Sequence, residues 1–418
     1  MRRVLALSMA LALTVAQPLP GWMTGTSQPE DLQVLLVTFS PGDEIPEWWG
    51  HTALVVQDQR THEGRLYNYG MFGFDEGFIG RFIQGRLEFW VGDGDSIMGT
   101  FEFYKRRLNR DVRVQELNLS PDQALQVAKA LGTNVLPANR MYLYQHYDDN
   151  CSTRPRDIID AAIGGQLKAA TAGPARMSLR QHTLRYSMVN PPMSWVLDFL
   201  QNDSLDRPIT MQNEAYLPDE LERQVQALVV TRADGTKVPL VKQRYDWFKS
   251  NRPSPPENPP NWLPYWLALG LLLAGIGHAF GHLGRNGARW ARLGLGAYTA
   301  LLGLVGGLFG TALAFLASFT NHLVAHRNEN LFFWNPAAFA LLPLGIMLMR
   351  NSPRAKGWLF NTWALLGGLS VLGIAVKVLP NFHQANWNVI AVLAPLNVGM
   401  AALYVLQRRH DAKQKPVT

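Results

Sequence analysis

The chain has almost no cysteine, since Cys151 is the only one among 418 residues. A single thiol cannot form a disulfide within its own chain, which excludes a disulfide framework and zinc sites built from paired cysteines. Polar and charged residues surround this cysteine throughout residues 144–157. That is unusual for a cysteine packed as a small hydrophobic side chain. We therefore interpret the thiol as reactive, the alternative being a buried inert thiol.

Signatures of metal, nucleotide and nucleic-acid chemistry are also missing. No glycine-rich phosphate loop or compact carboxylate cluster stands out, and the basic residues behind the net charge of +7 are not interleaved with stacking aromatics. Two histidine pairs have a spacing of four, but neither has the glutamate of metalloprotease helices; they are His278 with His282, and His322 with His326. The sequence therefore predicts no cofactor, no metal site and no nucleic-acid partner.

Long apolar runs, in contrast, fill the second part of the chain. Five segments are each long enough to span a bilayer as a helix: residues 262–280, 293–319, 331–349, 358–379 and 389–406. Arginine and lysine collect in the first and third loops between them and after the fifth segment. Basic loops stay in the cytoplasm, so the Cys151 part and the two polar loops are expected on the outer side.

This pattern divides the chain into five expected parts. Residues 1–25 combine a basic start with a short apolar run and predict an export signal or N-terminal anchor. Residues 28–250 form the soluble domain, 251–261 a proline-rich linker, and 262–407 the five-helix membrane domain. Residues 408–418 form a basic cytoplasmic tail.

The soluble part reads as a mixture of strands and helices. Alternating patterns predict strands at residues 33–39, 48–56, 65–69, 87–91 and 112–117. Helices are predicted from Ser120 to about 131, after Cys151 to about 164, and over residues 217–229. Residues 170–218, rich in proline and asparagine, are predicted to be irregular. Ser152 or Thr153 suits the N-cap of the second helix, which places Cys151 where a helix N-terminus favours a thiolate.

A nucleophilic thiol needs a base and a group that orients the base. His51 is our candidate base, because it lies near a strand start and follows Gly50, which allows close backbone approach. His146 and His62 are the rival bases. The backbone N–H of Cys151, at a helix start, is the candidate oxyanion donor.

Asn68, on the next predicted strand, is the candidate for the third catalytic residue. Its side-chain amide can accept a hydrogen bond from an imidazole N–H. Tyr67 and Tyr69 are the alternatives. Trp49, Tyr69 and Arg154 are predicted to contact the substrate.

The two outer loops resemble one another. One contains His326, Asn328 and Asn330, and the other has a similar Asn-x-Asn pattern within residues 383–388. These side chains are either solvated helix caps or a polar surface that contacts lipid head groups. On the second interpretation His326, Asn328 and Asn330 bind the substrate.

Several short motifs resemble the periplasmic domain of the Lnb-type bacterial lipoprotein N-acyltransferases over about residues 34–228. They are Ser40-Pro-Gly-Asp, Trp49-Gly-His-Thr-Ala-Leu, Tyr67-Asn-Tyr-Gly, Leu117-Asn-Leu-Ser, Asp149-Asn-Cys-Ser-Thr-Arg and Arg156-Asp. The resemblance implies an α+β, circularly permuted papain-like (NlpC-like) domain with a cysteine nucleophile at Cys151 and a catalytic histidine at His51. Together with the apolar segments, the expected fold class is this domain followed by an all-α bundle of five transmembrane helices.

The resemblance also implies an activity. An acyl chain would move from a membrane phospholipid, through a Cys151 thioester, to the α-amino group of the diacylglyceryl-cysteine of a lipoprotein. The protein would be a multi-pass protein of the bacterial inner membrane with its catalytic domain in the periplasm. Two alternatives are a membrane-anchored papain-like peptidase or amidase, and a non-catalytic protein that binds lipid or lipoproteins.

Overall fold

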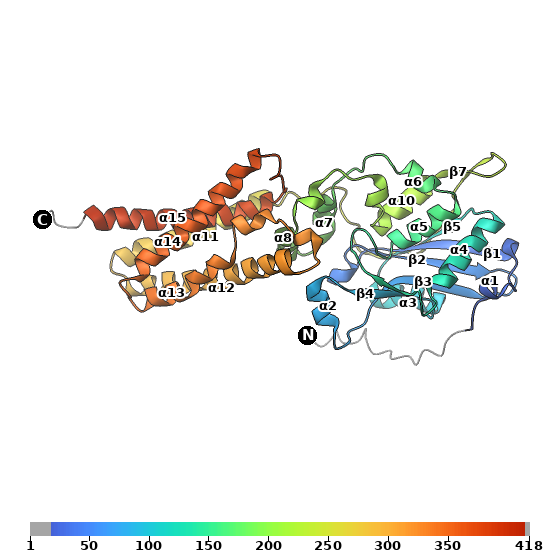
Figure 1. The fold of residues 1–418 in the computed structure, drawn as a ribbon, viewed down its shortest axis with the longest axis horizontal. Helices are drawn as coiled ribbons and strands as arrows, with labels where there is room; N and C mark the ends of the chain where they lie inside the picture. The colour runs from blue at the N-terminus through green and yellow to red at the C-terminus, as the bar shows by residue number, and fades with distance from the viewer. Residues whose placement is uncertain (1–17, 414–418) are drawn as a thin grey trace. The chain divides into compact units, whose positions relative to one another are not determined.

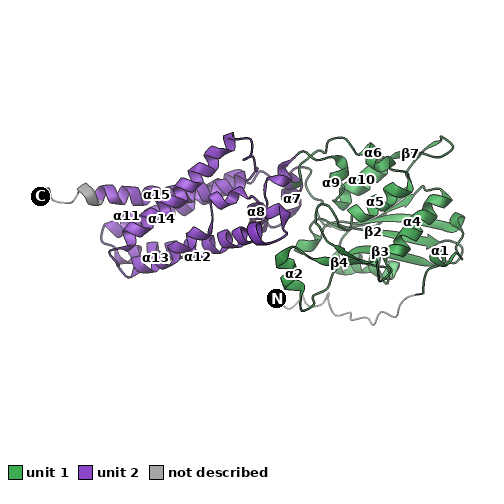
Figure 2. Ribbon diagram, in the orientation of Figure 1, with its two compact units in different colours: residues 1–179, 208–257 green, residues 180–207, 258–418 purple. Residues whose placement is uncertain are grey.

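The computed structural model describes residues 18–413, with side chains described to residue 410. Most of the expected export signal and the end of the basic tail lie outside these residues. The described chain forms two compact units, shown in different colours in Figure 2. Unit 1 comprises residues 18–179 and 208–257, and unit 2 comprises residues 180–207 and the chain from 258 onward. Residues 180–207, which the sequence places in the soluble domain, thus belong to the helical unit.

Unit 1 is built on an antiparallel seven-stranded sheet with the order β6-β4-β3-β2-β1-β5-β9. Its strands are β1 (Leu32–Phe39), β2 (His51–Asp58), β3 (Gly64–Met71), β4 (Glu88–Gly92), β5 (Val112–Leu117), β6 (Met141–Leu143) and β9 (Val241–Phe248). A separate hairpin pairs β7 (Val229–Thr231) with β8 (Lys237–Pro239). All five strands that the sequence predicts are present.

The interior strand β1 is buried on both faces of the sheet. Val34 and Leu36 pack into one hydrophobic core, whereas Val37 and Phe39 pack into a second core on the opposite face. Successive side chains of a strand point to opposite faces, so a nearly continuous apolar run requires cover on both sides.

Helices provide this cover. α4 (Pro121–Asn134), α5 (Thr153–Ala162) and α10 (Pro218–Ala227) contribute to the first core, and α3 (Ile97–Phe103) to the second (Figure 1). α4 begins at the predicted position with a capping box, in which Ser120 and Gln123 each bond the other's backbone N–H. The shorter helices of this unit are α1 (Gly21–Thr24), α2 (Phe78–Gln84), α6 (Gln166–Ala170) and α9 (Met211–Glu214).

The prediction that residues 170–218 are irregular is wrong. This stretch contains α9, α7 (Leu179–Ser187) and α8 (Pro191–Leu200). The prolines that suggested irregular structure begin α8, since Pro191 occupies its first turn and the Asn190 side chain caps the N–H of Met193. Proline is well tolerated at this position because the first N–H groups of a helix have no partner within the helix.

Unit 2 contains the apolar helices. Four of them are long and apolar enough to cross a membrane: α11 (Leu263–Arg285), α12 (Arg289–Phe319), α14 (Ala355–Ala375, continued to Val378) and α15 (Trp387–Lys413). The third predicted segment is a pair of helical pieces, 323–332 and 336–349, bent by 52° and ending in α13 (Leu341–Met349). Counting this pair as one span gives five, which confirms a helical region of four to five apolar helices.

Close helix contacts in unit 2 depend on small residues. A Cβ atom at Gly270 of α11 would lie 2.5 Å from the carbonyl oxygen of Ala391 in α15. The two backbones therefore approach at a distance that no larger residue permits, as is common between membrane helices.

Candidate active site

Cys151 lies in a tight turn just before α5, which begins at Thr153. The side chain of Asn150 caps this helix, because its Oδ1 accepts the N–H groups of Ser152 at 2.8 Å and Thr153 at 3.0 Å. Of the two predicted N-cap residues, Ser152 occupies the N-cap position but donates its hydroxyl to the carbonyl of Ala215 at 2.8 Å, and Thr153 is the first residue of the helix. The cap therefore comes from the residue before the cysteine, which sequence analysis missed.

Asn150 also uses both hydrogens of its amide. It donates to the carbonyls of His146 at 2.7 Å and Tyr216 at 3.0 Å, and its side chain is buried. Every polar group of this side chain is thus engaged, and each bond holds the backbone on one side of the thiol. These bonds fix the turn that carries the cysteine, which also packs against the first hydrophobic core.

Replacing Asn150 by alanine is expected to lower the free energy of unfolding of unit 1 by about 2–3 kcal/mol, because it removes a helix cap and leaves buried carbonyls unpaired. Asn150→Ser is the matched control, since a serine hydroxyl can keep the cap while the bonds from the amide are lost. Thermal unfolding of the full chain in detergent measures both. Equal loss in the two variants would contradict the capping role.

The thiol lies against the start of β2. Pairing between β2 and β3 ends at Ala53 and Asn68. The next residue toward the start of β2, Thr52, donates its backbone N–H to the sulfur of Cys151. On β3, a Cβ atom at Gly70 would lie 3.6 Å from the Cβ of Cys151, and the φ angle of +89° at this position favours glycine. The cysteine is therefore held where the two strands separate.

His51 is the first residue of β2 and immediately precedes Thr52. The Cβ of any larger residue at Gly50, with φ of +81°, would lie 2.9 Å from the carbonyl oxygen of Phe39, so glycine is required beside the histidine. The His51 Nε2 atom lies 2.6 Å from Oδ1 of Asn68. An amide oxygen only accepts, so Nε2 carries the hydrogen and Nδ1 has the lone pair of a base.

The other candidates for the orienting group and for the base do not contact each other in this way. Tyr67 accepts a hydrogen bond from Trp22 at 3.1 Å, and Tyr69 accepts one from Asn134 at 2.7 Å, so Asn68 is the residue bonded to His51. His62 lies in the turn beyond the other end of β2. An eight-residue strand, roughly 25 Å long, separates it from His51.

His146 is a nearer rival. Its ring lies 4.6 Å from the Trp49 ring and 5.5 Å from the Tyr216 ring, measured between centroids. Its Nδ1 is 3.3 Å from the Tyr144 hydroxyl, and no residue of the kind that orients a base is bonded to its Nε2 in the part of the chain described. Of these two histidines, His51 is therefore the one that is bonded to a group able to orient it as a base.

The helix start was expected to favour a thiolate, but the pKa of the Cys151 thiol is raised. Burial raises the pKa of the Cys151 thiol to about 11, although hydrogen bonds from backbone N–H groups act in the opposite direction. Burial also lowers the pKa of His51 to about 4. At neutral pH both groups are therefore uncharged, and the thiol needs a base at the moment of attack.

A buried arginine influences both groups. Arg110 is 2% exposed, and its guanidinium lies 4.8 Å from the centroid of the Tyr104 ring, which stacks on Phe39 at 3.7 Å. The Phe39 ring lies 6.0 Å from the His51 ring. The positive charge of Arg110 lowers the pKa of His51 and of Cys151, so it disfavours imidazolium and favours thiolate. The sequence places Arg110 only in a basic stretch and gives no signal of this position.

The pKa of His51 predicts how the rate of Cys151 acylation falls at acidic pH. A base with pKa about 4 is deprotonated above that pH, so thiol acylation should be nearly constant from pH 5.5 to 8 and fall as pH drops through about 4. An ordinary histidine of pKa about 6.5 would leave only roughly a tenth of the base active at pH 5.5. The pH dependence of the acylation rate under second-order conditions measures this. A midpoint between pH 6 and 7 would contradict a buried neutral base.

The predicted substrate contacts in unit 1 differ in exposure. Tyr69 is fully buried, and Trp49 is half-buried beside His146. Arg154 forms a two-point ion pair with Asp149 at 2.5 and 2.7 Å, and its guanidinium lies 3.9 Å from the Tyr142 ring centroid. Their roles toward a substrate stay predictions.

The other three predicted contacts belong to unit 2. Asn328 and Asn330 are buried, and both amides donate to the carbonyl of Phe199 in α8, at 3.4 and 2.8 Å. The imidazole of His326 is half-buried and lies 2.9 Å from the carbonyl of Thr320.

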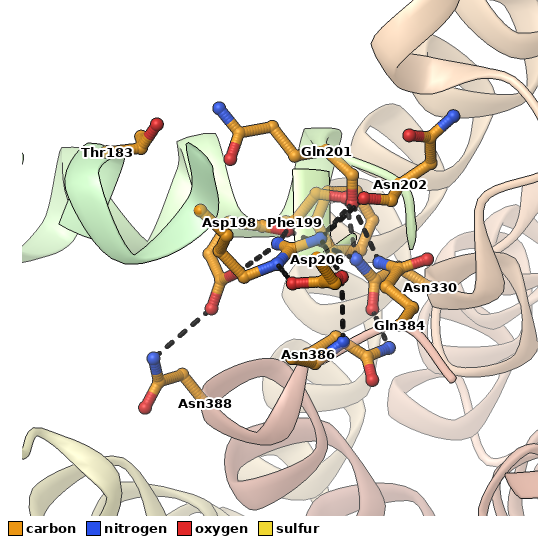
Figure 3. A network of polar contacts seen from close by, with 12 residues as sticks. Thr183, Asp198, Phe199, Gln201, Asn202, Asp206, Asn330, Gln384, Asn386 and Asn388 are labelled. Atoms are coloured by element: carbon orange, nitrogen blue, oxygen red, sulfur yellow. Dashed lines mark hydrogen bonds and ion pairs between the residues drawn. The ribbon is translucent and has the colours of Figure 1, made fainter. Parts of the chain in front are cut away.

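The two similar loops bind one another as well as α8 (Figure 3). Asn386 donates to Asn330 at 2.5 Å, and Gln384 donates to the carbonyl of Gln201 at 2.7 Å. Arg180 pairs with Asp198 at 2.5 Å and with Asp206 at 2.7 Å. We call these residues the α8 network; their shared role in the structure is to fasten α8 to the two loops.

A half-buried thiol with an imidazole–amide pair, on a chain with four to five apolar helices, defines a membrane protein with a thiol-bearing sheet domain. Residues 19–186 match the family model described as the Lnb N-terminal periplasmic domain. The match confirms the resemblance seen in the motifs. No curated protein and no solved structure matches the chain.

Proposed function

We propose that the protein is a lipoprotein N-acyltransferase of the bacterial inner membrane, with unit 1 as a permuted papain-like catalytic domain on the periplasmic side. The observation that carries the proposal is the bond between His51 and Asn68, together with the bond from the backbone of Thr52, the residue after His51, to the thiol of Cys151. The family match of residues 19–186 and the apolar helices support a substrate located in a membrane.

In the first half-reaction, Nδ1 of His51 takes the thiol proton as the sulfur of Cys151 attacks an ester carbonyl of a phospholipid. Asn68 holds the imidazole in the required tautomer, and the N–H of Cys151 donates to the developing oxyanion. The carbon–oxygen bond then breaks, His51 returns the proton to the leaving oxygen, and lysophospholipid departs. The acyl chain remains on Cys151 as a thioester.

In the second half-reaction, the α-amino group of a diacylglyceryl-cysteine attacks the thioester carbonyl. A nitrogen–carbon bond forms, the carbon–sulfur bond breaks, and His51 moves the proton of the amine to the sulfur. The products are an amide on the lipoprotein and the free thiol. An uncharged His51 suits both steps, because it accepts a proton in each.

Intact mass spectrometry of the purified protein after incubation with phospholipid tests the proposal. An added acyl mass that hydroxylamine removes and a diacylated lipopeptide discharges is the expected result. Cys151→Ser should gain no such mass, because a serine ester resists hydroxylamine under conditions that cleave a thioester. A folded wild-type protein without any adduct would contradict the proposal and favour peptide-bond chemistry.

A further inference from the structure

One surface of unit 1 exposes an unusual amount of apolar side chain. Four residues between the end of β3 and the end of α2 form what we call the α2 patch: Phe72 (37% exposed), Phe74 (63%), Ile79 (70%) and Ile83 (43%). α2 itself buries none of its residues. A helix usually gains its stability by burying an apolar face, so apolar side chains this exposed around a short helix are unusual.

The α2 patch is connected to the thiol by a row of aromatic rings. The Tyr144 ring stacks on Phe89 at 4.3 Å, and Phe89 stacks on Phe72 at 5.1 Å. Phe72 in turn lies 6.2 Å from Phe78 of α2. Tyr144 lies close enough to Cys151 for the charge of a thiolate to raise the pKa of the phenol, although burial raises it more.

The backbone of β3 also connects the surroundings of Cys151 to the α2 patch. Gly70, whose Cβ would lie 3.6 Å from the Cβ of Cys151, precedes Phe72 by two residues. The last residues of β3 therefore lead directly from the nucleophile into the α2 patch.

We propose that the α2 patch inserts into the hydrocarbon of a lipid bilayer and passes a single acyl chain along the aromatic row to Cys151. The occupant is lipid because unit 1 is covalently joined to four to five described helices that are long and apolar enough to cross a membrane. Exposed phenylalanine and isoleucine on a short helix, with Arg81 and Arg86 beside them, have the composition of an interfacial membrane segment. This inference deepens the proposed function and rests on it for the fate of the acyl chain.

The single cysteine makes insertion directly measurable. In the full chain with Cys151→Ser, we would introduce Ile79→Cys, attach an environment-sensitive NBD fluorophore, and reconstitute the protein into phosphatidylcholine–phosphatidylglycerol vesicles. Vesicles containing lipids with a doxyl quencher on the acyl chain should remove about half of the emission, because only a probe within the hydrocarbon contacts the quencher. Val229→Cys in the same background is the matched control, since Val229 is 55% exposed on β7 of the same unit.

Quenching at position 79 with little at position 229 is the expected result. A blue-shifted but unquenched probe at position 79 would show cover by protein and overturn the inference, as would equal quenching at both positions. These variants lack the thiol, so the measurement does not depend on acyl transfer. Quenching without any acyl adduct on the wild-type protein would refute the transferase alone, whereas an adduct without quenching would refute the α2 patch alone.

Discussion

His51→Ala is expected to slow the acylation of Cys151 by a factor of about 10³, within the range typical of general-base catalysis. The effect is large because burial raises the thiol pKa to about 11, which leaves only about one molecule in 10⁴ as thiolate at pH 7. Without a base, reaction depends on that small fraction. Time-resolved intact mass of the acyl adduct measures the rate, and alkylation by iodoacetamide gives a second reading free of lipid binding.

The variants His146→Ala and Asn68→Ala separate the roles within the site. His146→Ala should keep the acylation rate within about threefold of wild type, since that imidazole has no orienting partner of the kind that serves a base. Asn68→Ala should cost about tenfold to a hundredfold, because the imidazole of His51 remains but its tautomer is no longer fixed. A loss in His146→Ala as large as in His51→Ala would transfer the role of base to His146.

Arg180→Met is expected to lower the free energy of unfolding of unit 2 by about 3–5 kcal/mol, the usual cost of removing one partner of a buried ion pair. Arg180 is 2% exposed and bonds both Asp198 and Asp206. Burial already raises the pKa of the Asp198 carboxyl, and Arg180 is the main group that opposes this. Intrinsic tryptophan fluorescence during heating in detergent measures the change, for which we expect a fall in Tm of about 10 °C.

The double variant Arg180→Met with Asp198→Asn provides the control. Asparagine is neutral, so it removes the uncompensated charge and should recover part of the lost stability. A single variant that costs less than about 1 kcal/mol would mean that the pair contributes no more than an exposed one. The α8 network would then depend on its amide bonds instead.

The strands and membrane helices of this fold are visible in the sequence because they follow local rules. β1 appears as a continuous apolar run since both its faces are covered, and the spans appear as apolar segments of sufficient length. β9 was missed because most of its side chains are exposed and polar, as suits the edge of a sheet. α8 was missed because proline at a helix start resembles proline in a loop.

The candidate site was only partly predictable. His51, Asn68 and Cys151 stood out by residue type and by their places on predicted elements, and a resemblance to a known family supported two of them. Asn150 lies inside the same motif, and an asparagine two residues before a serine at a helix start is a signal that could have revealed the cap. Arg110 had no such signal, because its position depends on stacking with Tyr104, a contact that only the folded chain creates.

The placement of α8 has a practical consequence for preparing unit 1 alone. The chain passes between the two units three times, at residues 179–180, 207–208 and 257–258. Cutting at the proline-rich linker would therefore leave α8 attached to the thiol-bearing part without the loops that bind it. Trp195 and Phe199 pack among the apolar residues of unit 2, so the fragment would expose them to water and tend to aggregate. A soluble fragment requires residues 180–207 to be replaced by a short polar connection.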